Sequence, residues 1–268
     1  MHPNCVTPNI MKTAFTEKLN LTGRAALVTG AGVGIGRATA LALSEVGAFV
    51  GIHYHRSADE AEQVLDAVRA AGGDGLTMRA DLTREDEANA LVDRVVQEAG
   101  RLNILVNNAG ALVERARLED TSLELWQQTL DVNVTSAFIV TRRAIPHLRA
   151  DGNGSIINVL SLSVQTGGAN GAGAYAASKG ALQVFTRTLA RELAPQVRTN
   201  AVMPGVIETR HHEQATSPER MEQYRRETPL ARNGSAEEVA QAILYLASDA
   251  GAFTNGALLD INGGRFLR

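Results

Sequence analysis

From about residue 21 to its end, the chain alternates short apolar segments with longer segments of helical periodicity. The apolar segments are rich in Val, Ile, Leu and Ala and show little alternation of polar with apolar positions. This pattern is typical of strands that are buried on both faces of a parallel sheet. The predicted strands span Ala25–Thr29, Phe49–Tyr54, Leu76–Ala80, Ile104–Val106, Ser155–Leu160, Arg198–Met203 and Ala257–Ile261.

Helical periodicity fills the intervals between these strands. Gly72 and Gly100 follow two of the helical segments and act as stop signals. The predicted helices span Ile35–Val46, Ala58–Ala71, Arg84–Ala99, Leu123–Leu148, Ala174–Ala194 and Ala236–Ala247. Because parallel neighbours need helical crossovers, the alternation predicts an α/β fold with a doubly wound, seven-stranded parallel sheet flanked by helices.

The length of 268 residues favours one domain over two. We expect a flexible N-terminal tail over residues 1–20 and a single domain over residues 21–268. The polar segment 205–232, bracketed by Pro204 and Pro229, follows the carboxyl end of a predicted strand. Ligands bind at that end of such sheets, so this segment is predicted to be a substrate lid.

Composition and charge limit the kinds of ligand, metal site and cellular location that the chain can be expected to have. A formal net charge of -3 gives no electrostatic reason to expect nucleic acid. Cys5 is the only cysteine, which excludes a disulfide framework and a cysteine-rich zinc site. Residues 1–19 lack the features of a secretory signal, and no apolar run approaches the ~20 residues of a membrane span. We therefore expect a soluble, cytoplasmic protein that acts on a small molecule.

A glycine-rich turn joins the first predicted strand directly to a helix, with the sequence Thr29-Gly30-Ala31-Gly32-Val33-Gly34-Ile35-Gly36. Glycines let a pyrophosphate approach the backbone, and the helix N-terminus supplies free N–H groups and positive potential. A glycine-rich loop without a ligand is the alternative for a lone motif. Its position after the first strand favours a dinucleotide site.

The end of the second strand bears on the type of dinucleotide. NAD-binding units carry an acidic residue there, but here Tyr54 is followed by Arg56 and Ser57 and no Asp or Glu. An arginine beside a hydroxyl would bind a 2′-phosphate, whereas a carboxylate would repel it. The sequence thus favours NADP(H), with NAD(H) as the alternative. A solvated loop in which Arg56 contacts nothing would also fit.

Tyr175 and Lys179 are four residues apart, so in a helix they share a face. A free tyrosine has a pKa near ~10. A nearby ammonium and a cationic nicotinamide would lower that pKa towards the working range of a general base. The spacing alone fits an exposed helix face equally well. The context favours catalysis, because Ser161 directly follows a predicted strand and a loop of small residues, Gly167–Gly173, leads into the Tyr175 helix.

From Leu21 to Gly264 the chain resembles the short-chain dehydrogenase/reductase family in several segments, which follow one another in the family's order. The glycine turn is similar to TGxxxGIG, and the stretch from Gly154 to Lys179 is similar to GxIxNxSS…YxxSK. Further matches are Asn107-Asn108-Ala109-Gly110 to NNAG, the helix around Asp131-Val132-Asn133-Val134, the PG loop Met203-Pro204-Gly205-Val206, and the closing strand up to Gly264. The layout resembles the 3-oxoacyl-[acyl-carrier-protein] reductase branch most closely.

The resemblance implies a Rossmann fold and hydride transfer between a nicotinamide and a carbonyl carbon, without a metal. The implied catalytic residues are Asn133, Ser161, Tyr175 and Lys179. Ser161 would polarise the substrate oxygen, Tyr175 would act as general acid and base, and Lys179 would tune Tyr175 and bind the ribose. Asn133 would hold a water linking Lys179 to solvent. Ser163 is an alternative to Ser161, because the segment up to Tyr175 is one residue longer than usual.

The resemblance also implies the cofactor contacts. Asp81 would bind the adenine amino group, although a loop or helix-cap role is the alternative. Val33 lies where many NADP-using members carry a basic residue. The full set is Gly30, Gly32, Val33, Gly34, Ile35, Tyr54, Arg56, Ser57, Asp81, Leu82, Asn108, Ala109, Gly110, Tyr175, Lys179, Pro204, Gly205, Val206 and Thr209.

The substrate could be a small ketone, a polyol or sugar, or a 3-oxoacyl thioester. Gly152 and Gln196 stand at two places where carrier-protein reductases use arginines, which disfavours dedicated carrier-protein work. Family members usually form tetramers through helices that correspond to 123–148 and 174–194, so a homotetramer, or a dimer, is expected. A non-catalytic nucleotide sensor or a scaffold protein on the same fold is the alternative function.

Overall fold

Seven parallel strands form the centre of the computed structural model, which describes residues 8–209 and 216–267. The strand order is β3-β2-β1-β4-β5-β6-β9. The strands are β1 (Ala25–Val28), β2 (Phe49–Tyr54), β3 (Gly75–Arg79), β4 (Ile104–Asn107), β5 (Gly154–Val159), β6 (Val197–Pro204) and β9 (Leu258–Ile261). The predicted α/β fold with a seven-stranded parallel sheet is confirmed.

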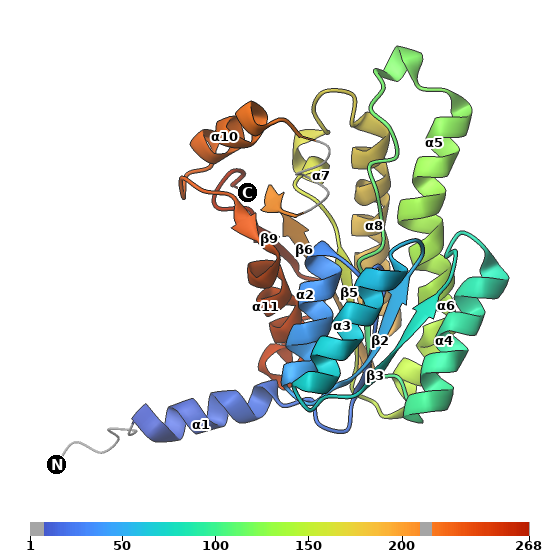
Figure 1. Cartoon of the computed structure of the whole chain (residues 1–268), viewed down its shortest axis with the longest axis vertical. Coiled ribbons are helices and arrows are strands. Elements are labelled where there is room, and N and C mark those ends of the chain that lie inside the picture. Colours follow the sequence, from blue (N-terminus) through green and yellow to red (C-terminus); the bar gives the residue numbers. More distant parts are fainter. Residues whose placement is uncertain (1–7, 210–215, 268) are drawn as a thin grey trace.

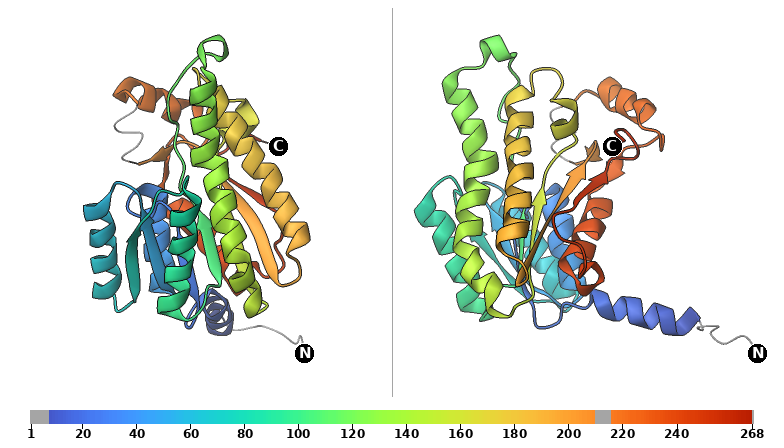
Figure 2. Two further views of the ribbon diagram at one scale, coloured as in Figure 1. Left: turned by 90° about the vertical axis from the view of Figure 1, so that its right-hand side faces the viewer. Right: turned by 180° about the vertical axis from the view of Figure 1, so that it is seen from behind.

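Helices cover both faces of the sheet (Figure 2). Strands β1, β4 and β5 are buried along their whole length, which explains why their sequences lack polar alternation. One face carries α2 (Gly34–Glu45), α3 (Ala58–Ala70) and α11 (Ala236–Ala247). The other face carries α4 (Glu85–Ala99), α6 (Ser136–Ala150) and α8 (Gly173–Glu192).

The direction of the strand order reverses at β1. This strand pairs with β2 on one side, through Val28 and Ile52, and with β4 on the other, through Val28 and Val106. In doubly wound sheets, the crevice at such a switch point lies at the carboxyl ends of the strands and binds ligands. The topology therefore brings the turns after β1 and β4 together at one edge of the sheet.

The helix predicted over 123–148 is present, but it contains a turn of π-helix that the sequence did not predict. It consists of α5 (Leu123–Leu130), a π-helical turn (Asp131–Thr135) and α6. Asn133 is fully buried, and its amide nitrogen donates to the carbonyl oxygen of Thr129, at 2.9 Å, in the preceding turn. A side chain that bonds to a backbone carbonyl of its own helix competes with the helical ladder, and π turns concentrate at functional sites.

Some short elements were not predicted. Helix α1 (Pro8–Leu19) falls within the expected tail and projects from the body (Figure 1). The expected lid contains α10 (Pro218–Glu227) and β7 (Ile207–Glu208), which pairs in parallel with β8 (Gly234–Ser235) just beyond the lid. The remaining short elements are α7 (Ser163–Thr166) and 3₁₀ turns at Leu118–Asp120 and Asp249–Gly251.

Residues 1–7 of the expected tail and 210–215 of the expected lid lie outside the described residues. Across 8–209 and 216–267, none of the helices has both the length and the apolar character needed to cross a membrane.

Candidate active site

The glycine turn after β1 has the geometry of an anion site. Gly30 and Gly34 adopt positive φ values of 64° and 55°. A Cβ on Gly36 would lie 2.2 Å from the carbonyl oxygen of Gly30, so only glycine lets α2 begin this close to the turn. The N-cap residue Val33 makes no side-chain capping bond. The first N–H groups of α2 are therefore available to a phosphate, which a helix N-terminus attracts.

The end of β2 lies beside this turn. A Cβ on Gly32 would be 2.6 Å from the Ser57 hydroxyl oxygen, so Ser57 directly borders the turn. Tyr54 is half-buried and Arg56 is exposed. Among the described residues, Arg56 makes no hydrogen bond or ion pair. Its guanidinium is thus available to a ligand, although the geometry is equally that of a solvated side chain.

Asp81 is engaged within its own turn. Its carboxylate accepts hydrogen bonds from the Thr83 hydroxyl at 2.7 Å and the Thr83 backbone N–H at 3.0 Å. The hydroxyl contact is the main reason why the pKa of Asp81 lies below its ordinary value. These contacts fit the loop role that the sequence offered as the alternative. The neighbouring Leu82 is buried in the core.

The loop after β4 is tied to the glycine turn. The Asn108 side-chain amide donates to the carbonyl oxygens of Thr29 and Gly30, at 2.8 and 3.0 Å. The Thr29 hydroxyl accepts from the backbone N–H groups of Asn108 and Ala109, both at 3.0 Å. These bonds hold the two turns at the switch point in one fixed arrangement.

Lys179 is buried at the centre of the site. Only 3% of it is exposed, and its ammonium donates to the Val159 carbonyl oxygen at 2.8 Å. Burial lowers the pKa of Lys179 to about 8. Its Nζ lies 5.8 Å from the centre of the Tyr175 ring, so the predicted pair does share one helix face. A Cβ on Gly110 would lie 3.1 Å from this Nζ, which places the end of the β4 loop against Lys179.

Ser161, rather than Ser163, acts on Tyr175. The Ser161 side chain lies near enough to the Tyr175 side chain to lower the tyrosine pKa. Burial has the larger, opposite effect, so the pKa of Tyr175 lies above its ordinary value. The Ser163 backbone N–H donates to the Ser161 hydroxyl oxygen at 3.1 Å. The Ser163 hydroxyl is buried and has no partner among the described residues.

Asn133 clamps the segment after the β4 loop. Its side-chain oxygen accepts from the Ala111 N–H at 3.1 Å, and its amide nitrogen donates to the Ala111 carbonyl oxygen at 2.9 Å. A Cβ on Gly110 would approach the Asn133 oxygen to 2.6 Å. The side chain therefore fixes the backbone beside Lys179, and its predicted role in holding a water remains a prediction.

The PG loop lies over the glycine turn. The Gly205 N–H donates to the Ile261 carbonyl oxygen at 2.9 Å, and Pro204 ends the buried part of β6. A Cβ on Gly34 would be 3.4 Å from the Thr209 methyl group. Val206, between Gly205 and Thr209 in the loop, is half-buried. Its carbonyl oxygen accepts a hydrogen bond from the Gly234 N–H at 3.0 Å. On the turn itself, Val33 is 39% exposed, whereas Ile35 packs against the core.

Comparison with known proteins agrees with this geometry. The family model described as enoyl-(acyl carrier protein) reductase matches residues 30–265. A 3-oxoacyl-[acyl-carrier-protein] reductase of Synechocystis sp. is 38% identical, and the match covers 92% of this chain and 98% of the relative. The chain belongs to the short-chain dehydrogenase/reductase family. It is therefore an oxidoreductase of carbonyl and alcohol groups that uses a nicotinamide cofactor.

Solved structures place this short-chain dehydrogenase/reductase among proteins that bind either nicotinamide. A 7α-hydroxysteroid dehydrogenase complexed with NADH and 7-oxo glycochenodeoxycholic acid is 31% identical, with a TM-score of 0.88 over 93% of this chain and 96% of that one. A short-chain dehydrogenase from Burkholderia cenocepacia in complex with NADP is 34% identical, with a TM-score of 0.84 over 92% and 99%. Nothing in these comparisons supports a non-catalytic sensor or scaffold.

Sequence reasoning missed the network of buried side-chain hydrogen bonds that supports the site of this short-chain dehydrogenase/reductase. The Asn107 amide donates to the Thr141 hydroxyl and to the Asn158 side-chain oxygen, at 2.9 and 2.8 Å. The Asn158 amide in turn donates to the Thr186 hydroxyl at 2.9 Å. This network of hydrogen bonds joins β4 and β5 to α6 and α8. Polar residues at the buried ends of apolar strands were the signal that could have revealed it.

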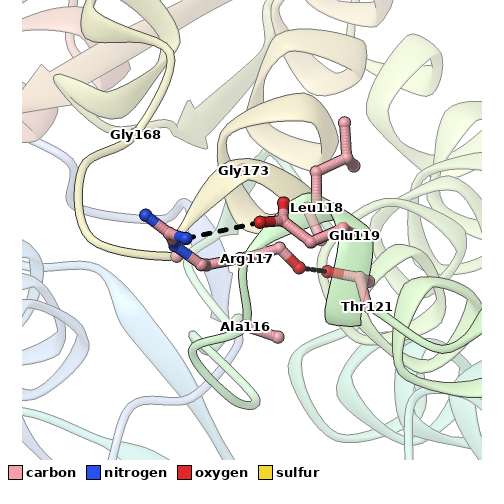
Figure 3. A pocket seen from close by; sticks show the side chains of 9 residues that line it. Ala116, Arg117, Leu118, Glu119, Thr121, Gly168 and Gly173 are labelled. Carbon is pink, nitrogen blue, oxygen red and sulfur yellow. Dashed lines mark hydrogen bonds and ion pairs between the residues drawn. The ribbon is translucent and has the colours of Figure 1, made fainter.

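A cavity of about 360 Å³ opens beside the N-terminus of the Tyr175 helix (Figure 3). It separates the loop around Arg117 from the small-residue loop around Gly168 and Gly173. Arg117 and Glu119 form an exposed ion pair at its wall. A larger hollow of about 670 Å³ lies at the amino ends of β1 and β2, away from the predicted site of this short-chain dehydrogenase/reductase.

Proposed function

We propose that this chain interconverts a small carbonyl compound and the corresponding alcohol, with Tyr175 as general acid and base. The observation that carries the proposal is the convergence of Ser161, Tyr175 and Lys179 at the carboxyl edge of the sheet. The Ser161 side chain lies near enough to Tyr175 to lower its pKa, and the Lys179 ammonium donates a hydrogen bond to the Val159 carbonyl oxygen. When bound, the nicotinamide supplies or accepts the hydride.

Each residue has a distinct part. Ser161 donates to the substrate oxygen and holds it next to Tyr175. Because burial raises the pKa of Tyr175, its hydroxyl is protonated in the protein alone and can deliver a proton during carbonyl reduction. In the direction of alcohol oxidation, the Lys179 ammonium and a cationic ring near the phenol favour the phenolate, which takes the proton back. Asn133 positions the loop beside Lys179.

The residues present fit a dinucleotide. The glycine turn and the N-terminus of α2 would hold the pyrophosphate, while Asn108, Ala109 and Gly110 and the PG loop would border the nicotinamide half. Lys179 would bind the ribose. The tight approach of Gly110 to the Lys179 ammonium fits this assignment, because a side chain there would fill the space.

We propose NADP(H) as the preferred cofactor. Arg56 is exposed and makes no bond within the described residues, and Ser57 borders Gly32. A guanidinium and a hydroxyl at this place suit a 2′-phosphate. Asp81 would bind the adenine through the carboxylate oxygen that Thr83 leaves free. The structures of relatives with NADH and with NADP show that the fold accepts both, so NAD(H) is the alternative.

The proposed substrate is a small ketone, a polyol or sugar, or a 3-oxoacyl thioester, with dedicated work on a carrier-bound thioester disfavoured. Dedicated carrier-protein work is disfavoured because Gly152 and Gln196 are uncharged and stand at places where the carrier-protein reductases use arginines. Residues 21–268 are proposed to act as one domain, with the segment 205–232 closing over the substrate.

We also propose that the chain forms a homotetramer, or a dimer, in the cytoplasm. On α6 and α8, Phe138 and Val184 are 43% and 60% exposed although both are apolar. Phe138 contacts Phe185 edge-to-face at 6.2 Å, so apolar side chains of the two helices meet near the surface. A content of one cysteine fits a reducing compartment.

The variant Tyr175→Phe tests the proposed chemistry. It removes only the hydroxyl that moves the proton, so kcat should fall by ~10²–10⁴-fold while the cofactor dissociation constant changes little. Absorbance of the reduced nicotinamide measures kcat, and calorimetry measures binding. Tyr245→Phe, on the far helix α11, is the matched control and should keep wild-type activity. Full activity of Tyr175→Phe would refute the assignment.

A further inference from the structure

His53 is a buried side chain to which neither motif nor mechanism gives a role. It lies near the carboxyl end of β2 and is 2% exposed. Its Nδ1 lies 3.0 Å from the backbone nitrogen of Gly30, and its Nε2 lies 3.1 Å from the carbonyl oxygen of Ala80. Both ring nitrogens are therefore used, and their partners belong to turns that follow two different strands.

The partners determine the protonation state of the ring. The Gly30 N–H can only donate and the Ala80 carbonyl can only accept, so Nδ1 must be the acceptor and Nε2 must carry the proton. The ring is therefore a neutral imidazole with a single tautomer. Burial, which lowers the pKa of His53 to about 4, favours the same state at neutral pH.

The backbone at the same place reinforces the connection. The Ala31 N–H donates to the His53 carbonyl oxygen at 2.7 Å, and the Ala80 N–H donates to the Tyr54 carbonyl oxygen at 3.1 Å. Strand β2 thus holds the turn after β1 on one side and the turn after β3 on the other. The His53 ring is the side chain that spans both, since β2 pairs with β1 and β3.

These two turns have different parts in the cofactor site. Gly30 opens the turn assigned to the pyrophosphate, and Ala80 precedes Asp81, which is assigned to the adenine. We propose that His53 is a positioning residue that sets the separation between the pyrophosphate side and the adenine side of the cofactor site. It acts through Gly30 and Ala80 and does not touch the cofactor. The inference rests on the cofactor placement given under the proposed function.

Two substitutions separate the two bonds. In His53→Asn the side-chain oxygen falls near the position of Nδ1, so the acceptor for Gly30 is kept and the donor to Ala80 is lost. In His53→Gln the amide nitrogen reaches the position of Nε2, so the donor to Ala80 is kept and the acceptor for Gly30 is lost. His53→Leu removes both. His147→Asn, on α6, is the matched control.

Calorimetry with NADPH and with 2′-AMP, which lacks the pyrophosphate, gives the readout. Losing one hydrogen bond corresponds to an affinity change of roughly 5- to 10-fold. His53→Gln should lower the affinity for NADPH by about this factor and leave the affinity for 2′-AMP unchanged. His53→Asn should lower the affinity for both ligands. His53→Leu should lower the affinity for NADPH the most. In His53→Asn and His53→Gln, kcat at saturating NADPH should stay within about twofold of the wild-type value.

A merely structural role predicts a different result. The unfolding midpoints of the ligand-free variants would fall, but the folded proteins would bind NADPH and 2′-AMP like the wild type, and this would overturn the proposal. If the wild-type protein binds NADH more tightly than NADPH, then NADH and adenosine replace the two probes. Failure of the NADP(H) proposal is thus visible in the wild type, whereas failure of the His53 proposal is visible only in the ratios between variants.

Discussion

Arg56 and Ser57 occupy the point where β2 leaves the core, and their side chains differ in how they are held. Ser57 is held against Gly32, so its hydroxyl has a defined place beside the glycine turn. Arg56 is exposed and, among the described residues, has no bonding partner. A phosphate bound here would gain a charge-assisted bond without breaking one inside the protein.

Arg56→Ala is expected to reduce kcat/KM with NADPH by roughly 10- to 100-fold, the effect of one charge-assisted hydrogen bond. With NADH, kcat/KM should change by less than about twofold, because no 2′-phosphate is present to be recognised. Initial rates with both cofactors measure the ratio. Arg69→Ala, at the far end of α3, is the control. An unchanged preference would assign Arg56 to the solvated loop that the sequence also allowed.

At this scale the sequence predicted Ser161, Tyr175 and Lys179, because their spacing matches a family pattern. The choice between Ser161 and Ser163 rested on alignment, and the contact with Tyr175 needed the folded loop. His53 was not predicted, because a single histidine in an apolar strand has no patterned neighbours. Its partners are backbone atoms 23 and 27 residues away, which only the sheet brings near.

At the scale of elements, the π turn between α5 and α6 shows how a side chain reshapes a helix. The apolar periodicity over 123–148 predicted one helix, and periodicity contains no information about a buried amide that bonds inward. Asn133 bonds to Thr129 within its helix and to Ala111 outside it. The strands, in contrast, were predicted to within one or two residues, since burial on both faces determines their composition.

Asn133→Ala tests this element. It leaves the N–H and carbonyl groups of Ala111 without their side-chain partner, so the free energy of unfolding should fall by about 1–3 kcal/mol. Because the loop beside Lys179 is then released, kcat should fall by at least about tenfold. Denaturant unfolding and steady-state kinetics measure the two effects. In the same turn, Thr135→Ala removes only a bond to Asp131 and should change neither. A variant with normal kcat would limit Asn133 to a structural role.

At the scale of the whole molecule, the sheet order brings every predicted site segment to one edge, as the alternation of strands and helices led us to expect. The structure of the segment 205–232, the predicted lid, is less well defined by sequence. Helix α10 buries none of its residues, so it has no apolar face that periodicity could detect. Ser217 at its N-cap and Pro218 after it were the only local signals.

The exposed apolar surface of α6 and α8 gives a prediction about assembly. Val184→Glu places a charge on the exposed side of α8, so the proposed tetramer should dissociate into dimers or monomers. Light scattering coupled to size-exclusion chromatography measures the mass. Gln63→Glu, on α3 at the opposite face of the sheet, should leave the mass unchanged. A wild-type monomer, or a tetrameric Val184→Glu variant, would contradict the proposed interface.

The burial of Lys179 couples folding to the proton concentration of the solvent. In the folded chain its pKa is about 8, against an ordinary value of 10.5. Between these pH values the unfolded chain binds a proton that the folded chain has released, so the free energy of unfolding rises as the pH rises through this window. Below pH 8 the buried Lys179 is protonated, and the free energy of unfolding is lower by the full cost of burying its charge, on the order of 3 kcal/mol. The ammonium that the proposed chemistry requires therefore makes the fold less stable at neutral pH than at alkaline pH.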